Sequence, residues 1–311
     1  MLYLFCFGGG RMISLIIPCY NEMESIPYFM KAINKVIDKM NEKFELIFVN
    51  DGSNDNTLNL LKDIAKKDKR VKYISFSRNF GKEAAMLAGL EASKGDYVAI
   101  MDADLQDPPE YLIEMYDGIV KEGYDCVGLR RTSRKGEPVI RSFFARCYYK
   151  LINKISDIKV VDGARDFRLM TRQMVNSILE LKENNRYSKG IFSWVGYNVK
   201  YLEYKNVERV AGTTKWSFFK LFKYSIDSIV GFSTFPLVIS AILGLLIMLI
   251  SFIMFIILLF GKDTLFGIVT LILFLNGINL LFIGILGIYI SKMHIELHNR
   301  PKYIVKEHNI K

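Results

Sequence analysis

Two acidic residues separated by one position are the clearest candidates for chemistry in this 311-residue chain. Asp102 and Asp104 come directly after an apolar run, residues 97–101, that is typical of a β-strand. Where a strand gives way to a loop, carboxylates at positions i and i+2 can both approach one divalent cation. Carboxylate oxygens select Mg²⁺ or Mn²⁺, which usually take phosphate oxygens as further ligands. The spacing therefore predicts a divalent-metal site formed by Asp102 and Asp104.

Two other polar segments follow apolar runs in the same way, at residues 18–22 (Pro-Cys-Tyr-Asn-Glu) and 50–53 (Asn-Asp-Gly-Ser). Asp51 suits a nucleotide site, because acidic residues at strand ends accept hydrogen bonds from a ribose or a base. By itself, Asp-Gly-Ser is simply a turn sequence. The chain has no Gly-x-Gly-x-x-Gly and no Gly-Lys-Ser/Thr segment, so neither a dinucleotide fold nor a P-loop is supported.

The three histidines, His294, His298 and His308, all lie within the last 18 residues. The rest of the chain therefore has no imidazole for a Ser-His-Asp or Cys-His catalytic centre, or for a His-ligated metal. The four cysteines are scattered without paired spacing, which argues against a disulfide scaffold and against a structural zinc site. Acid–base and metal chemistry in the main part of the chain must rely on carboxylates.

Short apolar runs alternate with helical stretches through the first hundred residues, and these elements must position the polar segments. The order is typical of βαβ units with a parallel sheet, in which ligands lie beyond the carboxyl ends of the strands. Because polar clusters follow the strands, we expect an α/β domain with its site at that edge. The predicted strands are residues 13–17, 45–49, 71–76 and 97–101, and the predicted helices are residues 26–40, 57–68 and 82–93.

Two long apolar stretches follow towards the C-terminus, at residues 232–260 and 264–291. They hold 29 and 28 residues without a formal charge, and each is longer than the roughly 20 residues that a transmembrane helix needs. Lys262 and Asp263 lie between them, which leaves room for a tight turn only. The sequence therefore predicts a C-terminal hairpin of two transmembrane helices.

The charge distribution predicts the orientation of this hairpin. Lys and Arg total 42 against 32 Asp and Glu, so the net charge is +10, and basic residues flank both outer ends of the hairpin. The positive-inside rule then places the large domain, both termini and a basic tail at residues 292–311 in the cytoplasm, beside the cell membrane. Anionic lipids account for the positive charge, so no nucleic-acid partner is expected.

Residues 130–155 and 213–231 are expected to form helices that lie in the membrane interface. In the first segment, basic and aromatic residues recur at helical spacing, as they do in helices at lipid surfaces. A solvated helix with a buried aromatic face is the alternative interpretation. The domain itself is expected to cover residues 12–231, with residues 1–11 a non-native or disordered extension and Met12 the natural start.

The polar segments together strongly resemble those of the inverting family 2 glycosyltransferases, which have the GT-A fold. The resemblance rests on residues 16–22 (Ile-Ile-Pro-Cys-Tyr-Asn-Glu), 50–53 and 102–106 (Asp-Ala-Asp-Leu-Gln). It implies a Rossmann-like α/β domain with a mainly parallel sheet and a nucleotide sugar as donor. Asn50 departs from the pattern, since many relatives carry a second aspartate there, and this leaves the nucleotide site one charge less negative.

Downstream features narrow the resemblance to the polyprenyl-phosphate glycosyltransferases, a group that includes bactoprenol glucosyltransferases and dolichyl-phosphate mannose synthases. These features are residues 166–170 (Asp-Phe-Arg-Leu-Met), the segment around Trp194 and the paired spans. The resemblance extends from residue 12 to about residue 300. It is specific for the class of reaction and not for the sugar.

The resemblance also implies roles for individual residues. Asp104 is implied as the direct metal ligand, with Asp102 near the ribose and the diphosphate. Asp166 is implied either as the general base or as a carboxylate that orients Arg168 and the acceptor phosphate. The nucleotide-sugar site is implied to include Pro18, Tyr20, Glu22, Asp51, Ala103 and Gln106, and we expect the cations Arg130 and Arg131 to stabilise the leaving diphosphate.

Basic residues between the sheet and the first span are candidates for binding the acceptor. Lys189, Arg209 and Lys215 can each pair with a lipid phosphate. Lys215 is the best placed, since it stands beside Trp216, a residue type that favours the headgroup level. Ordinary flanking charge is the alternative interpretation.

The resemblance implies transfer of one hexose to undecaprenyl phosphate for modification of a cell-envelope glycan, and the expected donor is UDP-glucose. A GDP-mannose-dependent synthase and an amino-sugar transferase are the alternatives. The Gln-x-x-Arg-Trp motif of processive synthases is absent, which favours a single transfer. A non-catalytic membrane anchor fits less well, because the acidic residues are retained. Gly244, Gly284 and Gly287 would allow the spans to pack closely in a homo-oligomer.

Overall fold

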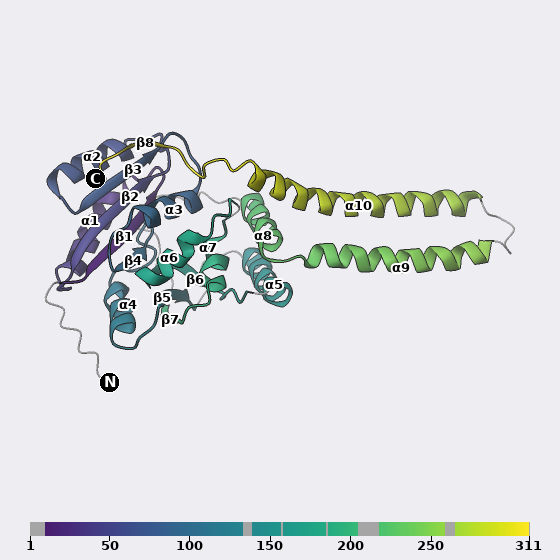
Figure 1. Ribbon diagram of the computed structural model, residues 1–311, viewed down its shortest axis with the longest axis horizontal. Coiled ribbons are helices and arrows are strands. Elements are labelled where there is room, and N and C mark those ends of the chain that lie inside the picture. The colour runs from purple at the N-terminus through teal and green to yellow at the C-terminus, as the bar shows by residue number, and fades with distance from the viewer. Residues whose placement is uncertain are drawn as a thin grey trace.

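The computed structural model describes residues 10–132, 139–156, 158–184, 186–204, 218–258 and 265–310. Within these ranges an eight-stranded sheet forms the centre of the large domain, in the order β7-β5-β6-β4-β1-β2-β3-β8 (Figure 1). Helices cover both faces of the sheet, and two long helices project away from it. The strands are β1 (Met12–Cys19), β2 (Lys43–Asn50), β3 (Val71–Phe76), β4 (Tyr97–Ile100), β5 (Cys126–Arg131), β6 (Ala164–Thr171), β7 (Val199–Tyr204) and β8 (Val305–His308).

The first four strands form the parallel sheet that the sequence predicts. β1 pairs in parallel with β2 and β4, and β2 pairs in parallel with β3. The helices between them are α1 (Ser25–Ile37), α2 (Thr57–Lys67) and α3 (Lys82–Ala92). The predicted bounds agree with these to within three residues, because the strand runs are buried and α1 and α2 present apolar faces to the sheet.

The other side of the sheet mixes strand directions, which the sequence did not predict. β6 lies antiparallel between β4 and β5, and β7 pairs in parallel with β5. α4 (Tyr111–Val120), α6 (Arg172–Glu180) and α7 (Ser188–Trp194) connect or cover these strands. Arg130 and Arg131 end β5, and do not begin an interfacial helix as expected. Pairing with β6 and β7 holds these two arginines in the sheet, and their charge gives no local signal of it.

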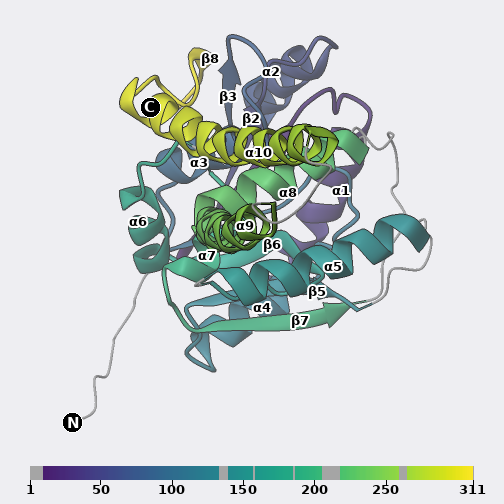
Figure 2. The same cartoon turned by 90° about the vertical axis from the view of Figure 1, so that its right-hand side faces the viewer.

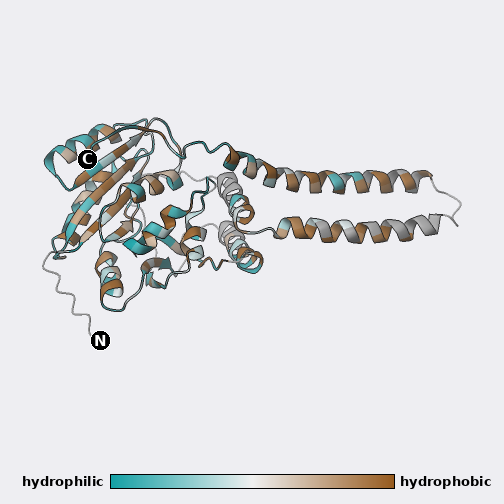
Figure 3. Cartoon of the chain, viewed as in Figure 1, coloured by the Kyte–Doolittle hydropathy of each residue, from teal (hydrophilic) through white to brown (hydrophobic). Residues whose placement is uncertain are grey.

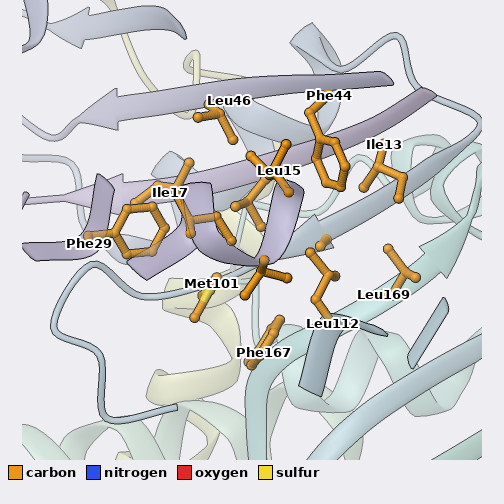
Figure 4. Close-up of a cluster of buried hydrophobic side chains, with 14 of the residues drawn as sticks. Ile13, Leu15, Ile17, Phe29, Phe44, Leu46, Met101, Leu112, Phe167 and Leu169 are labelled. Carbon is orange, nitrogen blue, oxygen red and sulfur yellow. The ribbon is translucent and has the colours of Figure 1, made fainter. Parts of the chain in front are cut away.

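Two hydrophobic clusters, one on each face of the sheet, hold the domain together. The first packs α1 and α4 on the sheet (Figure 4), and it includes Phe29, whose ring meets Phe48 edge to face at 6.0 Å. The second packs α3, α6 and α7 on the opposite face. α3 approaches β1 closely at Gly89, where a Cβ would lie 2.2 Å from Ile16 Cγ2. This packing fixes the edge at which the polar segments lie.

Two long apolar helices, α9 (Phe235–Leu258) and α10 (Leu265–Leu297), project antiparallel and side by side from the domain (Figures 1 and 3). Within the described residues, Phe274–Leu297 is long and apolar enough to cross a membrane. Ser225–Phe232 and Phe235–Gly244 together form a second candidate, which bends by 84° at the break between them. The structure thus provides one candidate span, or two if the bent pair is counted, and the predicted pair of spans stays a prediction.

Two shorter helices, α5 (Val139–Ile155) and α8 (Phe218–Phe232), lie across the base of α9 and α10 (Figure 2). They fall within the two segments predicted as interfacial helices, of which residues 133–138 and 213–217 lie outside the described residues. The Tyr148 hydroxyl of α5 donates to Tyr187 Oη (3.1 Å) and lies 2.6 Å from Ser228 Oγ of α8. Tyr148 and Tyr149 of α5 are thus partly buried against the domain, and the position of α5 in a membrane interface stays a prediction.

The last residues return to the sheet, whereas the sequence predicted a basic tail at residues 292–311. α10 continues to Leu297, and β8 pairs antiparallel with β3. The unpaired backbone groups at the edge of β3 supply the partner, and the tail sequence itself carries no sign of this pairing. At the other end of the chain, Arg11 Nη1 donates to Tyr97 Oη (2.9 Å), and residues 1–9 lie outside the described residues.

Replacing Phe29 by alanine should lower the free energy of unfolding by about 3–5 kcal/mol, because the fully buried ring leaves a cavity. Thermal unfolding of the purified protein in detergent measures this loss. The neighbouring Tyr28 is 55% exposed, so Tyr28→Ala should change stability by less than about 0.5 kcal/mol. Equal losses in the two variants would contradict the packing described for α1.

Candidate active site

The two acidic residues of the predicted metal motif lie at the carboxyl end of β4, as expected. Asp102 follows two residues after this strand ends, and its side chain is 26% exposed. Asp104 Oδ1 accepts a hydrogen bond from Gln106 N (3.1 Å). Leu105 between them has a φ of 56°, a left-handed conformation that a leucine adopts only when its surroundings enforce it. The turn is therefore held in a strained shape at the edge of the sheet.

A lysine that the sequence analysis did not single out joins Asp102 to Asp166. Lys82 begins α3, and its Nζ lies 2.7 Å from Asp102 Oδ1 and 2.6 Å from Asp166 Oδ2. The cation offsets the repulsion between two carboxylates that come from neighbouring strands. No local pattern marks this lysine, because its partners lie 20 and 84 positions away in the sequence.

This arrangement keeps Asp166 ionised. Burial alone would raise the pKa of Asp166, but the positive charges of Lys82 and Lys189 outweigh it and hold that pKa well below its usual range. Burial would likewise lower the pKa of Lys82, but Asp102 and Asp166 raise it above its usual value. Since a general base works best with a pKa near the working pH, the site favours Asp166 as an orienting carboxylate.

Asp51 holds the loop that follows β3. The residue is 3% exposed, and its two carboxylate oxygens accept hydrogen bonds from Phe80 N (2.6 Å) and Gly81 N (2.9 Å). Burial raises the pKa of Asp51, and the two hydrogen bonds offset this only in part. Gly52 has a φ of 63°, and a Cβ there would lie 2.3 Å from the carbonyl carbon of Arg78. The Asp-Gly turn is therefore a packed contact with the loop that leads into α3.

The turn after β1 is tied to the turn after β2. Asn21 has a φ of 53°; its N–H donates to Ser53 Oγ (2.9 Å) and its Oδ1 accepts from Asn54 N (2.9 Å). These bonds bring the half-buried Tyr20 and Glu22 to the edge at which β2 ends. The structure thus gathers at one edge the predicted nucleoside-binding residues Pro18, Tyr20, Glu22 and Asp51.

Arg165 is a second residue that the sequence analysis missed. Its Nε donates to Asp107 Oδ1 (2.8 Å), and its Nη2 lies 3.5 Å from Gln106 Oε1. Asp107 is buried, so this guanidinium supplies the charge that it needs. Ala103, a predicted contact of the nucleotide sugar, is also buried. Arg165 thus holds the end of the turn that carries Asp104.

Arg168 is buried, with 2% of its surface exposed. Its guanidinium lies over the Phe192 ring at 3.8 Å, and its Nη2 donates to Arg165 O (2.8 Å). Residues two apart on a strand share a face, so Arg168 lies one pleat deeper along β6 than Asp166. Arg168 thus packs beneath α7, and its predicted catalytic role stays a prediction.

The other predicted cations of the donor site lie at the end of β5. Arg130 Nε donates to Asp162 O (3.2 Å), and its Nη1 lies 3.5 Å from Glu203 Oε1. Arg131 is the last residue of the strand. Because β5 runs in the same direction as β4, both arginines lie at the sheet edge that carries Asp102.

Of the predicted acceptor-binding residues, the structure places one. Lys189 lies in α7, close enough to Asp166 to lower the pKa of that carboxyl group. It therefore faces the same cluster as Lys82. The other two, Arg209 and Lys215, fall outside the described residues.

The carboxylates suit a divalent cation that also takes ligands from a substrate. In the part of the chain that the structure describes, no three His, Cys, Asp or Glu residues form a group that could hold a metal ion. Asp102 and Asp104 supply oxygen donors only, which fits Mg²⁺ or Mn²⁺ bound jointly by protein and phosphate oxygens. The residues present therefore fit the predicted metal.

Comparison with known proteins identifies the family. The family model described as Glycosyl transferase family 2 matches residues 14–179, a range that includes Asp51, Lys82, Asp102 and Asp166. The chain belongs to glycosyltransferase family 2. This membership confirms the resemblance drawn from the three polar segments, and it makes the chain a glycosyltransferase with the GT-A fold.

The similarity to full-length relatives extends beyond this domain. The Bacillus subtilis (strain 168) protein CsbB is 46% identical over 307 residues, which cover 96% of this chain and 92% of CsbB. The SfII prophage-derived bactoprenol glucosyl transferase of Shigella flexneri is 42% identical over 311 residues, which cover 95% of this chain and 97% of the relative. Among solved structures, mannosyl-3-phosphoglycerate synthase from Rubrobacter xylanophilus aligns with 70% of this chain and 72% of its own at 16% identity, with a TM-score of 0.49.

Lys82→Gln should lower the free energy of unfolding by about 1–3 kcal/mol at pH 7, because two partly buried carboxylates lose their cation. The pKa of Asp166 is depressed in the folded protein, so this stabilisation is complete above about pH 5 and declines as the pH falls below the unfolded value near 3.9. Thermal unfolding at neutral pH and at about pH 3.5 should show the gap between variant and wild type narrowing. Lys66→Gln is the control, since that side chain is 75% exposed. A gap of the same size at both pH values would refute the linkage.

Proposed function

We propose that this glycosyltransferase moves a single hexose, glucose from UDP-glucose, to undecaprenyl phosphate at the cytoplasmic face of the cell membrane. The product would be a polyprenyl-phosphate sugar for modification of a cell-envelope glycan. The observation that carries the proposal is the cluster of Asp102, Asp104, Asp166 and Lys82 at the carboxyl edge of the sheet. Relatives named bactoprenol glucosyl transferase, from Shigella phages SfII and SfV, are 42% and 41% identical over most of the chain. Their names are the reason for proposing glucose as the sugar and a polyprenyl phosphate as the acceptor.

The nucleoside would lie across the ends of β1 and β2. Tyr20 and Glu22 are half-buried there, beside the turn that holds Asp51. Each oxygen of the Asp51 carboxylate accepts one backbone hydrogen bond and keeps a second lone pair for a ribose or base donor. Asp102 and Gln106 would follow along the same edge, towards the diphosphate and the sugar.

The diphosphate would lie at Asp102 and Asp104, where negative charge develops as the nucleotide leaves. Mg²⁺ or Mn²⁺ bound by Asp104 and Asp102 would neutralise that charge. Lys82 adds a fixed positive charge 2.7 Å from Asp102, and the arginines at the end of β5 add two more at the same edge.

The acceptor phosphate would meet Lys189 beside Asp166. A phosphate monoester has a second pKa of about 6, so it is largely dianionic at neutral pH and needs no base to remove a proton. Asp166 would then hold Lys82 and orient the acceptor, which agrees with its depressed pKa. Direct attack on the anomeric carbon inverts it, so an α-linked donor would give a β-linked lipid product.

The hairpin of α9 and α10 would cross the membrane twice. β8 follows α10 and belongs to the same sheet as β3, so the start of α9 and the end of α10 must lie on one side of any membrane that they cross. An even number of crossings satisfies this condition. The basic residues that flank the outer ends of the hairpin favour the cytoplasm for that side.

A transfer assay tests this function. Full-length protein in detergent would be given undecaprenyl phosphate, Mg²⁺ and, in turn, labelled UDP-glucose, UDP-N-acetylglucosamine and GDP-mannose. We expect label to enter the organic phase with UDP-glucose, and Asp104→Ala to lower the rate by about 100-fold or more. Asp117→Ala is the matched control, because its side chain is 46% exposed and pairs with Lys121. Transfer from GDP-mannose or the amino sugar alone would reassign the donor, and no transfer from any donor would contradict the proposal.

The pH dependence of transfer tests the role of Asp166. Because its pKa is held well below the usual range, Asp166 stays ionised from about pH 5 to pH 9, and a general base would need a pKa nearer that window. Asp166→Asn should therefore lower kcat/KM by a similar factor at every pH, so that the two profiles run parallel. Loss of an acid limb in the variant alone would restore the general-base assignment.

A further inference from the structure

The segment after α10 contacts β3 and the first residue of the loop that leads from β3 to the proposed donor site. β8 pairs with β3 along Ile74, Ser75 and Phe76, and it is the outermost strand on that side of the sheet. One more hydrogen bond extends this pairing beyond the strand, from Ser77 N to Ile304 O (2.9 Å). The first residue of the loop that follows β3 is therefore held by the C-terminal segment.

Tyr303 adds an aromatic contact at the same point. Its ring stacks on Phe76 with centroids 4.8 Å apart and planes 17° apart, and its hydroxyl donates to Glu91 of α3. Phe76 in turn meets Phe80 edge to face at 5.8 Å. Tyr303 therefore packs against Phe76, and Phe76 in turn supports the ring of Phe80 near the end of the loop at residues 77–81.

The same loop, residues 77–81, is the one that Asp51 holds. The backbone N–H groups of Phe80 and Gly81 donate to the Asp51 carboxylate, and the next residue is Lys82, which pairs with Asp102 and Asp166. A shift of this loop would therefore move the nucleoside side and the diphosphate side of the site together.

We propose that Tyr303 and Ile304, which lead into β8, are a positioning element for the donor site, in which Tyr303 acts through Phe76 and Phe80 to set the loop that orders Asp51 and Lys82. This inference rests on the proposed function in one respect: it assumes that the ligand bound near Asp51 and Lys82 is a nucleotide sugar. Because the segment continues from α10, it also connects the membrane hairpin mechanically to donor binding.

A residue of β8 that does not contact the loop provides the control for the Tyr303 variants. Glu307 pairs with Lys62 of α2 (2.6 Å), and Asn309 exchanges hydrogen bonds with Tyr73, so these residues hold the strand without touching the loop. Glu307→Gln should loosen the strand and leave the loop in place. Tyr303→Phe keeps the stacked ring and loses only the hydroxyl contact, so it should rescue most of what Tyr303→Ala loses.

The experiment measures UDP binding by calorimetry, donor KM and kcat, and amide hydrogen exchange of residues 77–83, on the full chain in detergent. Tyr303→Ala should raise the Kd for UDP and the donor KM about tenfold, as loss of an aromatic pair implies, with a smaller change in kcat. Amide exchange of Phe80 and Gly81 should quicken in the same variant. Tyr303→Phe and Glu307→Gln should stay within about threefold of wild type.

Two results would overturn the inference. One is unchanged exchange of Phe80 and Gly81 in Tyr303→Ala, and the other is an equal rise in donor KM for Tyr303→Ala and Glu307→Gln, which would indicate a general loss of stability. Hydrogen exchange needs no substrate. If the wild type bound no UDP, the proposed donor would fail while the exchange data still decided whether Tyr303 positions the loop.

Discussion

Lys82 lies between two carboxylates, and the geometry of the site depends on this shared ion pair. Asp102 and Asp166 come from neighbouring strands and would repel each other at the edge of the sheet. One ammonium group, within 2.7 Å of an oxygen of each, removes that conflict and ties the end of β4 and the start of β6 to the first residue of α3. The antiparallel strand β6 can therefore lie beside β4 with the two acidic residues close together. Under the proposed function, the same ammonium group would lie near the leaving diphosphate.

The loop at residues 77–81 connects the Lys82 ion pair to the turn that follows β2. Asp51 accepts its backbone N–H groups, and Gly52 lets it approach so closely that a side chain would collide with it. The turns after β1 and β2 are hydrogen-bonded to each other as well. The polar residues that follow β1, β2, β3 and β4 thus form one connected set, in which moving one turn disturbs its neighbours. Such a network suits a site that must present several groups to one extended ligand.

The helices α5, α8, α9 and α10 are fastened to one another and to the domain at several points. Lys292 of α10 pairs with Asp227 of α8 (2.6 Å), and the Tyr289 hydroxyl donates to Ser233 O (2.6 Å) at the start of α9. Tyr148 links α5 and α8 to Tyr187, next to α7. The return of β8 to the sheet adds a covalent route from α10 to the edge beside the donor loop. Helices and catalytic domain are therefore held together at both ends of the hairpin.

The sequence alone determined the parts in which one residue's environment follows from its near neighbours. Hydrophobic periodicity predicted β1 to β4 and α1 to α3, and the apolar run before Asp102 and Asp104 predicted that these residues follow a strand. Two long uncharged stretches predicted α9 and α10. Tertiary structure alone decided the rest: Lys82 finds its acids 20 and 84 positions away, and Tyr73 and Asn309, which pair across β3 and β8, are 236 positions apart. It also buried Arg168, whose position on the sheet the sequence analysis did not predict. Charged side chains and the unpaired backbone groups of an outer strand bind partners that only the fold brings close. The local sequence pattern therefore does not predict those partners.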